Sequence, residues 1–330
     1  MKLVALVPFK NEAWVLPAYI SSVAPVVDEI VAVDGGSTDG SRRLLEEAGA
    51  HVVDEATMVD LDSVDKRGDV VGADVWSERP VRNLLLRLGR ERGGTHFLSV
   101  DADEALTTPC LDSLRGSLAA LEPGQKLAMQ WLTLWKQPTE YREDESVWTR
   151  LFKDFAWADV PESELLGIAR TAGDATTARW TRLPVERGAV LHYQFVPWWR
   201  AQTKQAWYRC AALVRHPETA YHLNRMYAIT LDSASARTVS VPPAWVDGIM
   251  VPEGIADLPP AWHLDAMLAL FDQHGIEFFE PLQIWHVPQL HEAFLEAAGR
   301  EPQPLVRLSL AKRAKRAVTT RLEGIAAKRG

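Results

Sequence analysis

The stretch Phe97-Leu98-Ser99-Val100-Asp101-Ala102-Asp103-Glu104 decides the expected fold. A short apolar run followed at once by closely spaced acids is typical of a buried strand that carries carboxylates to the carboxyl edge of a sheet. Open α/β folds bind their ligands at that edge. We therefore expect this stretch to form both a central strand and the acidic end of a binding site.

Asp101 and Asp103 allow two interpretations. Carboxylate oxygens are hard ligands that suit Mg²⁺ or Mn²⁺, which proteins bind through one or two carboxylates while substrate phosphates complete the coordination shell. Alternatively, the acids cap the next helix, and an isolated Asp-x-Asp pattern would favour that simpler role. The motifs elsewhere in the chain favour the metal-diphosphate site.

The composition is that of an ordinary globular chain. Its 330 residues are 47% hydrophobic and 24% charged, which suits one large domain or two modest ones. The net charge of -8 provides no overall attraction for nucleic acid. Two cysteines, Cys110 and Cys210, cannot form a disulfide framework and fit a reducing compartment. The apolar run at 1–8 is too short for a signal peptide and no stretch reaches transmembrane length, so we expect a soluble cytoplasmic protein.

Strand and helix patterns alternate from the first residues. Continuous apolar runs predict three buried strands, at Leu3–Val7, Glu29–Val33 and His51–Val53. Helical spacing predicts two helices between them, at Ala13–Val23 and Arg42–Ala48. The glycines of Asp34–Gly40 permit a tight turn in which Ser37 or Thr38 caps the second helix. This order is typical of a parallel, right-handed α/β layer.

The middle of the chain continues the alternation after an irregular segment. Residues 54–78 lack periodicity and predict a long surface loop at the ligand edge. The next patterns predict two helices, at Val81–Arg92 and Pro109–Leu121. Alternating and apolar runs then predict strands at Lys126–Trp135, Ser146–Lys153 and Ala189–Tyr193.

Four motifs lie at the ends of these strands or on a helix. They are Val7-Pro8-Phe9-Lys10-Asn11-Glu12, Val33-Asp34-Gly35-Gly36-Ser37-Thr38-Asp39-Gly40-Ser41, Arg82-Asn83 and Val100-Asp101-Ala102-Asp103-Glu104. In this order they resemble the motifs of the GT-A glycosyltransferases of family 2. The bacterial lipopolysaccharide-core and exopolysaccharide branch is the nearest resemblance, through Arg150-Leu151-Phe152-Lys153, Pro161-Glu162 and Leu191-His192-Tyr193.

The resemblance implies an α/β fold of the GT-A (Rossmann-like) type, with a mostly parallel sheet flanked by helices. It covers residues 1–215, which would form the catalytic domain that binds a nucleotide sugar. The nucleotide pocket would be lined by Pro8, Lys10, Glu12 and Asp34, with Asp34 facing the base. Arg79 and Arg82 lie three apart on one helix face, and either would reach the base, ribose or phosphate while the other stays on an exposed basic edge.

The resemblance also implies a metal site for Mn²⁺ or Mg²⁺. Asp103 would bind the ion directly, and Asp101 would hold the ribose or a metal-bound water. His192 resembles the histidine that serves as the third ligand in such enzymes. A lone histidine is otherwise more often a satisfied core residue, and that alternative stays open here.

Catalysis by an inverting transferase requires a carboxylate on the acceptor side, which takes the hydroxyl proton. The resemblance gives this role to Glu162, with Glu164 as the competitor because Pro161 replaces the histidine of the usual His-Glu pair. Gly35 replaces the second acid of the usual Asp-Asp-Gly-Ser, which removes one contact near the base or ribose. The metal would neutralise charge that grows on the nucleoside diphosphate leaving group.

Residues 216–330 lie beyond the resemblance and would form an acceptor-side lobe with mixed structure. The patterns predict a helix at Trp262–His274 and a strand at Ile276–Val287. At Leu305–Lys328, apolar residues alternate with lysine and arginine at helical spacing, which predicts a basic amphipathic helix. Such a helix packs on the body of the protein or docks on an anionic membrane, so peripheral contact at the inner face of the membrane is an open alternative.

The predicted function is a metal-dependent, inverting transferase of the hexosyltransferase type, which moves a sugar from a nucleoside-diphosphate sugar to a hydroxyl acceptor. A sugar-nucleotide binding module without catalysis is the main alternative, and Asp101, Asp103 and the candidate base speak against it. A nucleotidyltransferase would need a Gly-rich, Arg-containing first loop, which the sequence lacks. The acidic net charge disfavours a DNA-base glycosyltransferase and nucleic acid partners in general.

Overall fold

The computed structural model describes residues 1–54, 78–143, 152–165, 170–172, 179–231, 236–259 and 262–305. The chain divides into two compact units. The first unit consists of Met1–Trp198 with Ala236–Leu258, and the second of Trp199–Ser235 with Pro259–Gly330. Residues 236–258, which the sequence analysis assigned to a C-terminal lobe, therefore belong with the sheet of the first unit.

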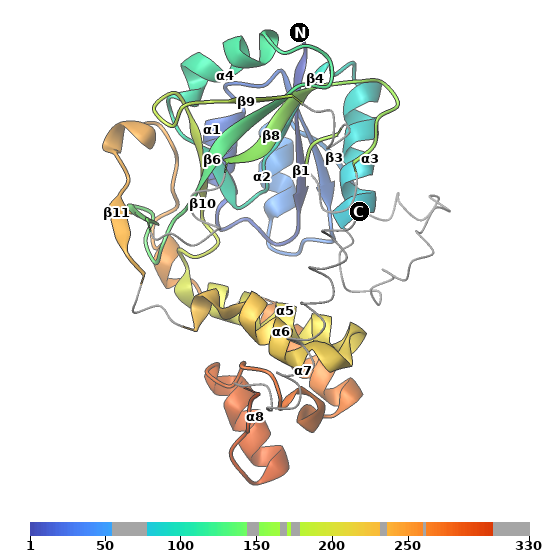
Figure 1. Cartoon of the computed structure of the whole chain (residues 1–330), viewed down its shortest axis with the longest axis vertical. Coiled ribbons are helices and arrows are strands. Elements are labelled where there is room, and N and C mark those ends of the chain that lie inside the picture. Colours follow the sequence, from blue (N-terminus) through green and yellow to red (C-terminus); the bar gives the residue numbers. More distant parts are fainter. Residues whose placement is uncertain are drawn as a thin grey trace, which may run out of the picture. The chain divides into compact units, whose positions relative to one another are not determined.

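The first unit is built on a nine-stranded sheet in the order β3-β2-β1-β4-β8-β6-β10-β5, with β9 beside β6 (Figure 1). The strands are β1 (Leu3–Phe9), β2 (Glu29–Asp34), β3 (His51–Asp54), β4 (His96–Ser99), β5 (Glu104–Leu106), β6 (Lys126–Thr133), β8 (Phe152–Ala158), β9 (Trp180–Arg182) and β10 (Ala189–His192). Strands β3, β2, β1 and β4 run parallel to one another, as do β6, β9 and β10, while β8 and β5 are antiparallel to their neighbours. The predicted α/β class with a mostly parallel sheet is confirmed.

Helices cover both faces of the sheet because side chains alternate along each strand. Leu3, Ala5 and Val7 of β1 belong to one buried cluster, and Val4 and Leu6 belong to the other. Three helices supply apolar residues to the first cluster: α1 (Leu16–Val23), α2 (Ser41–Glu47) and α4 (Cys110–Ala119). The second cluster is covered by α3 (Glu78–Glu91). This layering confirms the predicted sheet flanked by helices.

Two boundaries differ from the sequence expectations. The first helix begins at Leu16 rather than Ala13, because residues 12–15 form a turn in which the Val15 N–H donates to the Glu12 carbonyl at 3.0 Å. The strand predicted to end at Lys153 instead runs from Phe152 to Ala158 as β8. Residues 144–151 and the loop expected at 54–78, apart from its two ends, lie outside the described residues.

A small second sheet belongs to the same unit. It pairs β7 (Glu140–Arg142) with β11 (Thr238–Ser240) in antiparallel register. The proline-rich segment that follows β11 packs against the main sheet, since Val241 and Ile255 are buried in one cluster with Leu132 of β6 and Leu191 of β10. Residues 241–255 therefore pack on the main sheet.

The second unit is helical. Its main helices are α5 (Trp198–Arg215), α6 (Ala220–Met226), α7 (His263–His274) and α8 (Pro288–Ala298). The helix predicted at Trp262–His274 is confirmed as α7, but the strand predicted at Ile276–Val287 is wrong. That segment opens with the 3-10 helix η6 (Ile276–Phe279), and several of its apolar residues are buried. A short apolar run is typical of a buried strand but also of other buried segments, which explains the wrong prediction.

The described residues bear on only one of the two expectations about membranes. Within the described parts of the chain, no helix is long and apolar enough to cross a membrane. The basic amphipathic helix expected at Leu305–Lys328 lies outside the described residues except for Leu305 itself. Its docking on a membrane stays a prediction.

Two helical glycines give opposite expectations for the same substitution. A Cβ at Gly89 of α3 would lie 2.7 Å from Phe97 Cε1 and 3.0 Å from Leu6 Cδ2, whereas a Cβ at Gly116 of α4 would meet nothing within 4 Å. Gly89→Ala is expected to lower the free energy of unfolding by about 1–3 kcal/mol through overpacking against the sheet. Gly116→Ala is expected to raise it by about 0.5–1 kcal/mol, because alanine restricts the unfolded chain more than glycine does.

Urea unfolding of the two variants, followed by circular dichroism, measures both effects in the same protein. Equal free energies of unfolding for Gly89→Ala and wild type would mean that α3 does not pack on β1 and β4 as closely as described.

Candidate active site

The site is organised at the carboxyl edge of the main sheet. Strands β4, β6 and β10 point the same way and end at this edge, and β8 begins there because it runs antiparallel to β4 and β6. The turn between β4 and β5 carries Asp101 and Asp103, and its Glu104 N–H donates to the Asp101 carbonyl at 2.9 Å. Asp101 and Asp103 therefore follow directly after a strand end, as the sequence predicts.

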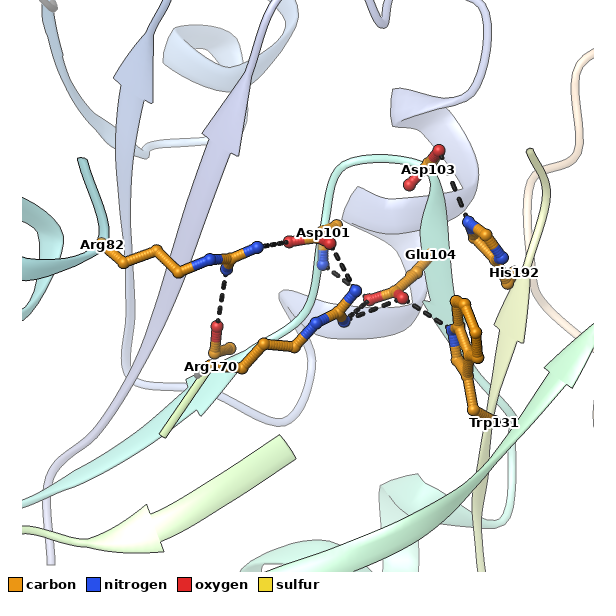
Figure 2. Close-up of polar contacts among 8 residues, drawn as sticks. Arg82, Asp101, Asp103, Glu104, Trp131, Arg170 and His192 are labelled. Atoms are coloured by element: carbon orange, nitrogen blue, oxygen red, sulfur yellow. Dashed lines mark hydrogen bonds and ion pairs between the residues drawn. The ribbon is translucent and has the colours of Figure 1, made fainter. Parts of the chain in front are cut away.

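Asp103 and His192 face each other across this edge (Figure 2). The distance between Asp103 Oδ2 and His192 Nε2 is 3.6 Å, and both side chains are buried. Strand pairing sets the arrangement, since His192 is opposite Glu104 in the β5–β10 register and the Tyr193 N–H donates to the Asp103 carbonyl at 2.8 Å. The His192 ring also stacks on Trp131, with ring centroids 4.4 Å apart. Two of the predicted metal ligands are thus brought together.

Asp101 faces arginines instead. Its Oδ1 accepts from Arg82 Nη2 at 3.0 Å, and its Oδ2 accepts from Arg170 Nη2 at 2.6 Å. Burial alone would raise the pKa of Asp101, but the positive charges of Arg170 and Arg82 outweigh it and lower that pKa. Arg82 additionally donates to Ser99 Oγ at 3.3 Å. Asp101 is therefore an anionic residue whose two oxygens are both bound by guanidinium groups.

Glu104 is the centre of the cluster and was not singled out as a site residue from sequence. Its fully buried carboxylate accepts from Arg170 Nη1 at 2.8 and 2.6 Å and from Trp131 Nε1 at 2.7 Å. The Asp101 N–H also donates to Glu104 Oε2 at 2.8 Å. The acid next to Asp103 was a visible signal for Glu104, but nothing in the sequence pointed to Arg170, which lies 66 residues away.

The predicted set of three metal ligands is only partly assembled. Asp103 and His192 meet, while Asp101 is turned to Arg82 and Arg170. Within the described parts of the chain, no group of three or more His, Cys, Asp or Glu side chains is arranged to hold a metal ion by itself. A facing carboxylate and imidazole, too far apart for a hydrogen bond, still fit a two-residue site in which substrate phosphates supply the remaining ligands.

The turns after β1 and β2 interlock and form the predicted nucleotide side of the site. Asn11 adopts a left-handed conformation with a φ of 54°, its side-chain oxygen accepts from the Thr38 N–H at 2.7 Å, and its own N–H donates to Ser37 Oγ at 3.0 Å. The Glu12 N–H donates to Ser41 Oγ at 2.8 Å. Because these bonds join residues about 27 positions apart, the two turns are fixed relative to each other.

The residues predicted to line the nucleotide pocket occupy these same turns. Pro8 pairs with Val33, one position before Asp34, and Lys10 and Glu12 follow β1 directly. Asp34 is buried, and its Oδ1 accepts from the Ser37 N–H at 2.8 Å. The backbone of α3 carries Arg79 and Arg82, but only the Arg82 side chain lies within the described part of the structure.

Glu162, predicted as the acceptor-side base, lies at the other edge of the sheet from Asp103 and His192. Strand β8 runs antiparallel to β4, so its last residue, Ala158, pairs with His96 at the start of β4. The next residue, Asp159, is held there by Arg90 at 2.8 Å, and both Glu162 and Glu164 are exposed just beyond it. An antiparallel strand carries the chain away from the acids, and Glu162 lies next to Ser163, which accepts from Arg90 at 3.0 Å.

Lys153 of the Leu-Phe-Lys motif lies at the correct edge. Its Nζ is 3.1 Å from the centroid of the Trp131 ring. Burial and the nearby charge of Arg170 lower the pKa of Lys153 to about 8, against the opposing effects of Glu104, Asp101 and Asp154. The lysine therefore adds a titratable positive charge beside the acidic cluster.

Comparisons with known proteins gave distant structural matches. No protein-family model matches the chain, and no curated protein matches it. The crystal structure of S. aureus TarS is 20% identical with a TM-score of 0.27, and the match covers 42% of this chain and 22% of TarS. Glucosyl-3-phosphoglycerate synthase from Mycobacterium tuberculosis, in complex with Mg²⁺ and UDP, is 22% identical with a TM-score of 0.30 and coverages of 40% and 43%. The same enzyme in complex with Mn²⁺, UDP and glucosyl-3-phosphoglycerate has a TM-score of 0.29 at 22% identity, with coverages of 40% and 44%.

The matched segment spans less than half of each of these chains. At such low scores the matches carry no weight for the activity of this chain, which is inferred below from its own residues.

The environment of Lys153 predicts a pH-dependent stability. The pKa of Lys153 is lowered from 10.5 to about 8 in the folded state, so between these values the unfolded state binds more protons than the folded state. The free energy of unfolding should therefore rise with pH over that window in wild type relative to Lys153→Met, in which this titration is absent. Chemical denaturation of both proteins from about pH 7 to 10 measures the difference. A difference that stays constant with pH would place Lys153 in solvent.

Proposed function

We propose that this chain is a metal-dependent glycosyltransferase that moves a sugar from a nucleoside-diphosphate sugar to a hydroxyl acceptor, with inversion at the sugar carbon. The pairing of Asp103 with His192 at the carboxyl edge carries the proposal. A carboxylate and an imidazole in this position suit a divalent cation whose shell a diphosphate completes. The interlocked turns after β1 and β2 lie at the same edge and suit the nucleoside.

Individual residues would have the following roles. Asp103 and His192 would hold Mn²⁺ or Mg²⁺, which when bound would neutralise the negative charge that grows on the diphosphate as the sugar leaves. Asp34 and the turn of residues 34–41 would receive the base and ribose. Arg82, fixed by Asp101 and Ser99, would keep a positive charge beside the diphosphate. The group that accepts the acceptor proton is not assigned, since Glu162 lies near Arg90 at the opposite edge and both Glu162 and Glu164 are exposed.

A second candidate is a sugar-nucleotide binding module without transfer activity. One observation favours it: Asp101 and Glu104, two of the three acids at residues 101–104, are ion-paired with Arg170. Release of the nucleoside diphosphate from a donor, measured with and without Mn²⁺, separates the two. Metal-dependent release supports the transferase, whereas donor binding without release supports the module.

The proposal is tested first by ligand binding. Nucleoside-diphosphate sugars of each base are screened, with and without Mn²⁺, for an increase in melting temperature, because a ligand that binds only the folded state stabilises it. The expected result is a shift that needs the metal and the diphosphate together. A chain that no nucleotide sugar stabilises, at any metal concentration, does not have this function.

Asp103→Ala and His192→Ala are expected to remove the metal-dependent part of that shift. Each substitution deletes a predicted ligand, and the expected loss of Mn²⁺ affinity in the presence of nucleoside diphosphate is at least ~10-fold to 100-fold. Asp112→Ala is the matched control, because Asp112 is an exposed aspartate on α4. Calorimetric titration of Mn²⁺ provides the affinities. Wild-type affinity in both ligand variants would refute the site.

Glu162→Gln is expected to leave turnover unchanged within about twofold, because an exposed side chain at the opposite edge cannot take the acceptor proton. Donor turnover by the variant is compared with wild type under identical metal and donor concentrations. Loss of turnover with normal donor binding would restore Glu162 as the base and would require residues 159–165 to move.

A further inference from the structure

The acids on either side of Asp103 in the turn after β4 are bound by one guanidinium group. Arg170 donates through Nη1 to both oxygens of Glu104 and through Nη2 to Asp101, at 2.6–2.8 Å. Figure 2 shows its side chain reaching between the two carboxylates, with Asp103 turned away toward His192. The two ends of the turn that carries Asp103 are thereby tied to each other from outside the turn.

The chain brings Arg170 to this place by a defined route. After β8, residues 159–165 are tethered to α3 through the Arg90–Asp159 ion pair and through Asn83, whose amide donates to the Leu165 carbonyl at 3.2 Å while its oxygen accepts from the Leu165 N–H at 2.9 Å. Thr171, next to Arg170, donates to Asp154 of β8. These contacts hold residues 159–165 on α3 and Thr171 on β8.

Neutralising the buried Glu104 explains only part of this geometry. A single positive charge, such as an ammonium group, would suffice to compensate a buried carboxylate. A guanidinium group differs because its planar fork can hold two acceptors at a fixed separation. Here the fork is used in that way, on Asp101, two positions before Asp103, and on Glu104, immediately after it.

We propose that Arg170 is a positioning residue of the donor site. By holding Asp101 and Glu104 together, it sets the turn of residues 100–104 so that Asp103 faces His192 in the geometry that binds the metal-diphosphate. This inference rests on the proposed function. It gives Asp101 a structural task, as the acceptor for Arg170 and Arg82, in place of direct contact with the ribose or the metal.

The decisive variant is Arg170→Lys. Lysine keeps a positive charge near Glu104 but cannot bridge to Asp101 with a fork. The matched control is Arg300→Lys, since Arg300 donates to both carboxylate oxygens of Glu280 within the second unit. Mn²⁺ affinity is measured by calorimetry in the presence of saturating nucleoside diphosphate, and folding is followed by thermal melting.

Arg170→Lys is expected to melt cooperatively and to lose roughly 10-fold or more in Mn²⁺ affinity, as for other residues that orient a metal ligand. Arg300→Lys is expected to keep wild-type affinity even if its melting temperature falls. Equal affinities in wild type, Arg170→Lys and Arg300→Lys would overturn the positioning role while leaving the proposed function intact. Wild type that binds no metal with any nucleoside diphosphate would overturn the proposed function and this inference with it.

A second variant, Asp101→Asn, keeps the test decisive if Arg170→Lys unfolds. Asp101→Asn weakens the bridge at its other end and leaves the Arg170–Glu104 pair in place, so it should lower Mn²⁺ affinity by itself. If both variants fold, the double variant should lose little more Mn²⁺ affinity than either single variant, because both substitutions break the same Asp101–Arg170 contact. Additive losses would show that Asp101 acts on the ligand independently of Arg170. Wild-type affinity in Asp101→Asn would equally contradict the inference.

Discussion

The fully buried carboxylate of Glu104 is the constraint on which the acidic edge depends. A buried charge is tolerated only when it is paired and hydrogen-bonded, and Glu104 is both, through Arg170, Trp131 and the Asp101 N–H. This requirement joins three parts of the chain: the turn after β4, the middle of β6 and the segment after β8. The position of Asp103 follows from it, because Asp103 lies between two residues that are held in place.

The parts of the fold predicted correctly are those with local signals. The first two strands, their helices and the glycine-containing turn between them follow from apolar periodicity and turn chemistry within about 50 residues. The interlocking of the two turns through Asn11 and Ser37 could not be predicted in detail, since it joins residues that only the finished sheet brings together. Strand pairing in the second half is equally non-local, so the order β4-β8-β6-β10-β5 had no signal in the sequence.

The site shows the same division between local and non-local information. Asp103 and His192 were predicted from motifs at strand ends, and they meet because β5 and β10 are paired. Glu162 was placed by motif order alone, which says nothing about direction. Once β8 is antiparallel to β4, the residues directly after its end lie at the far edge of the sheet, as Asp159 does beside Arg90. Arg170 escaped prediction for the complementary reason, because its function depends on a tether to α3 that leaves no periodic pattern.

The charges of the neighbouring side chains explain why Asp101, Asp103 and Glu104 differ in role although their chemistry is similar. Glu104 is buried and fully bonded, so it is structural, and Asp101 shares its two oxygens between two arginines that remain charged at any relevant pH. Asp103 faces an imidazole, which carries no permanent charge and can itself bind a cation. In the proposed function, a divalent ion would therefore be best accommodated at Asp103, where it would meet a carboxylate and an imidazole without displacing a guanidinium group. The arginines would thus direct the metal to one acid of the three.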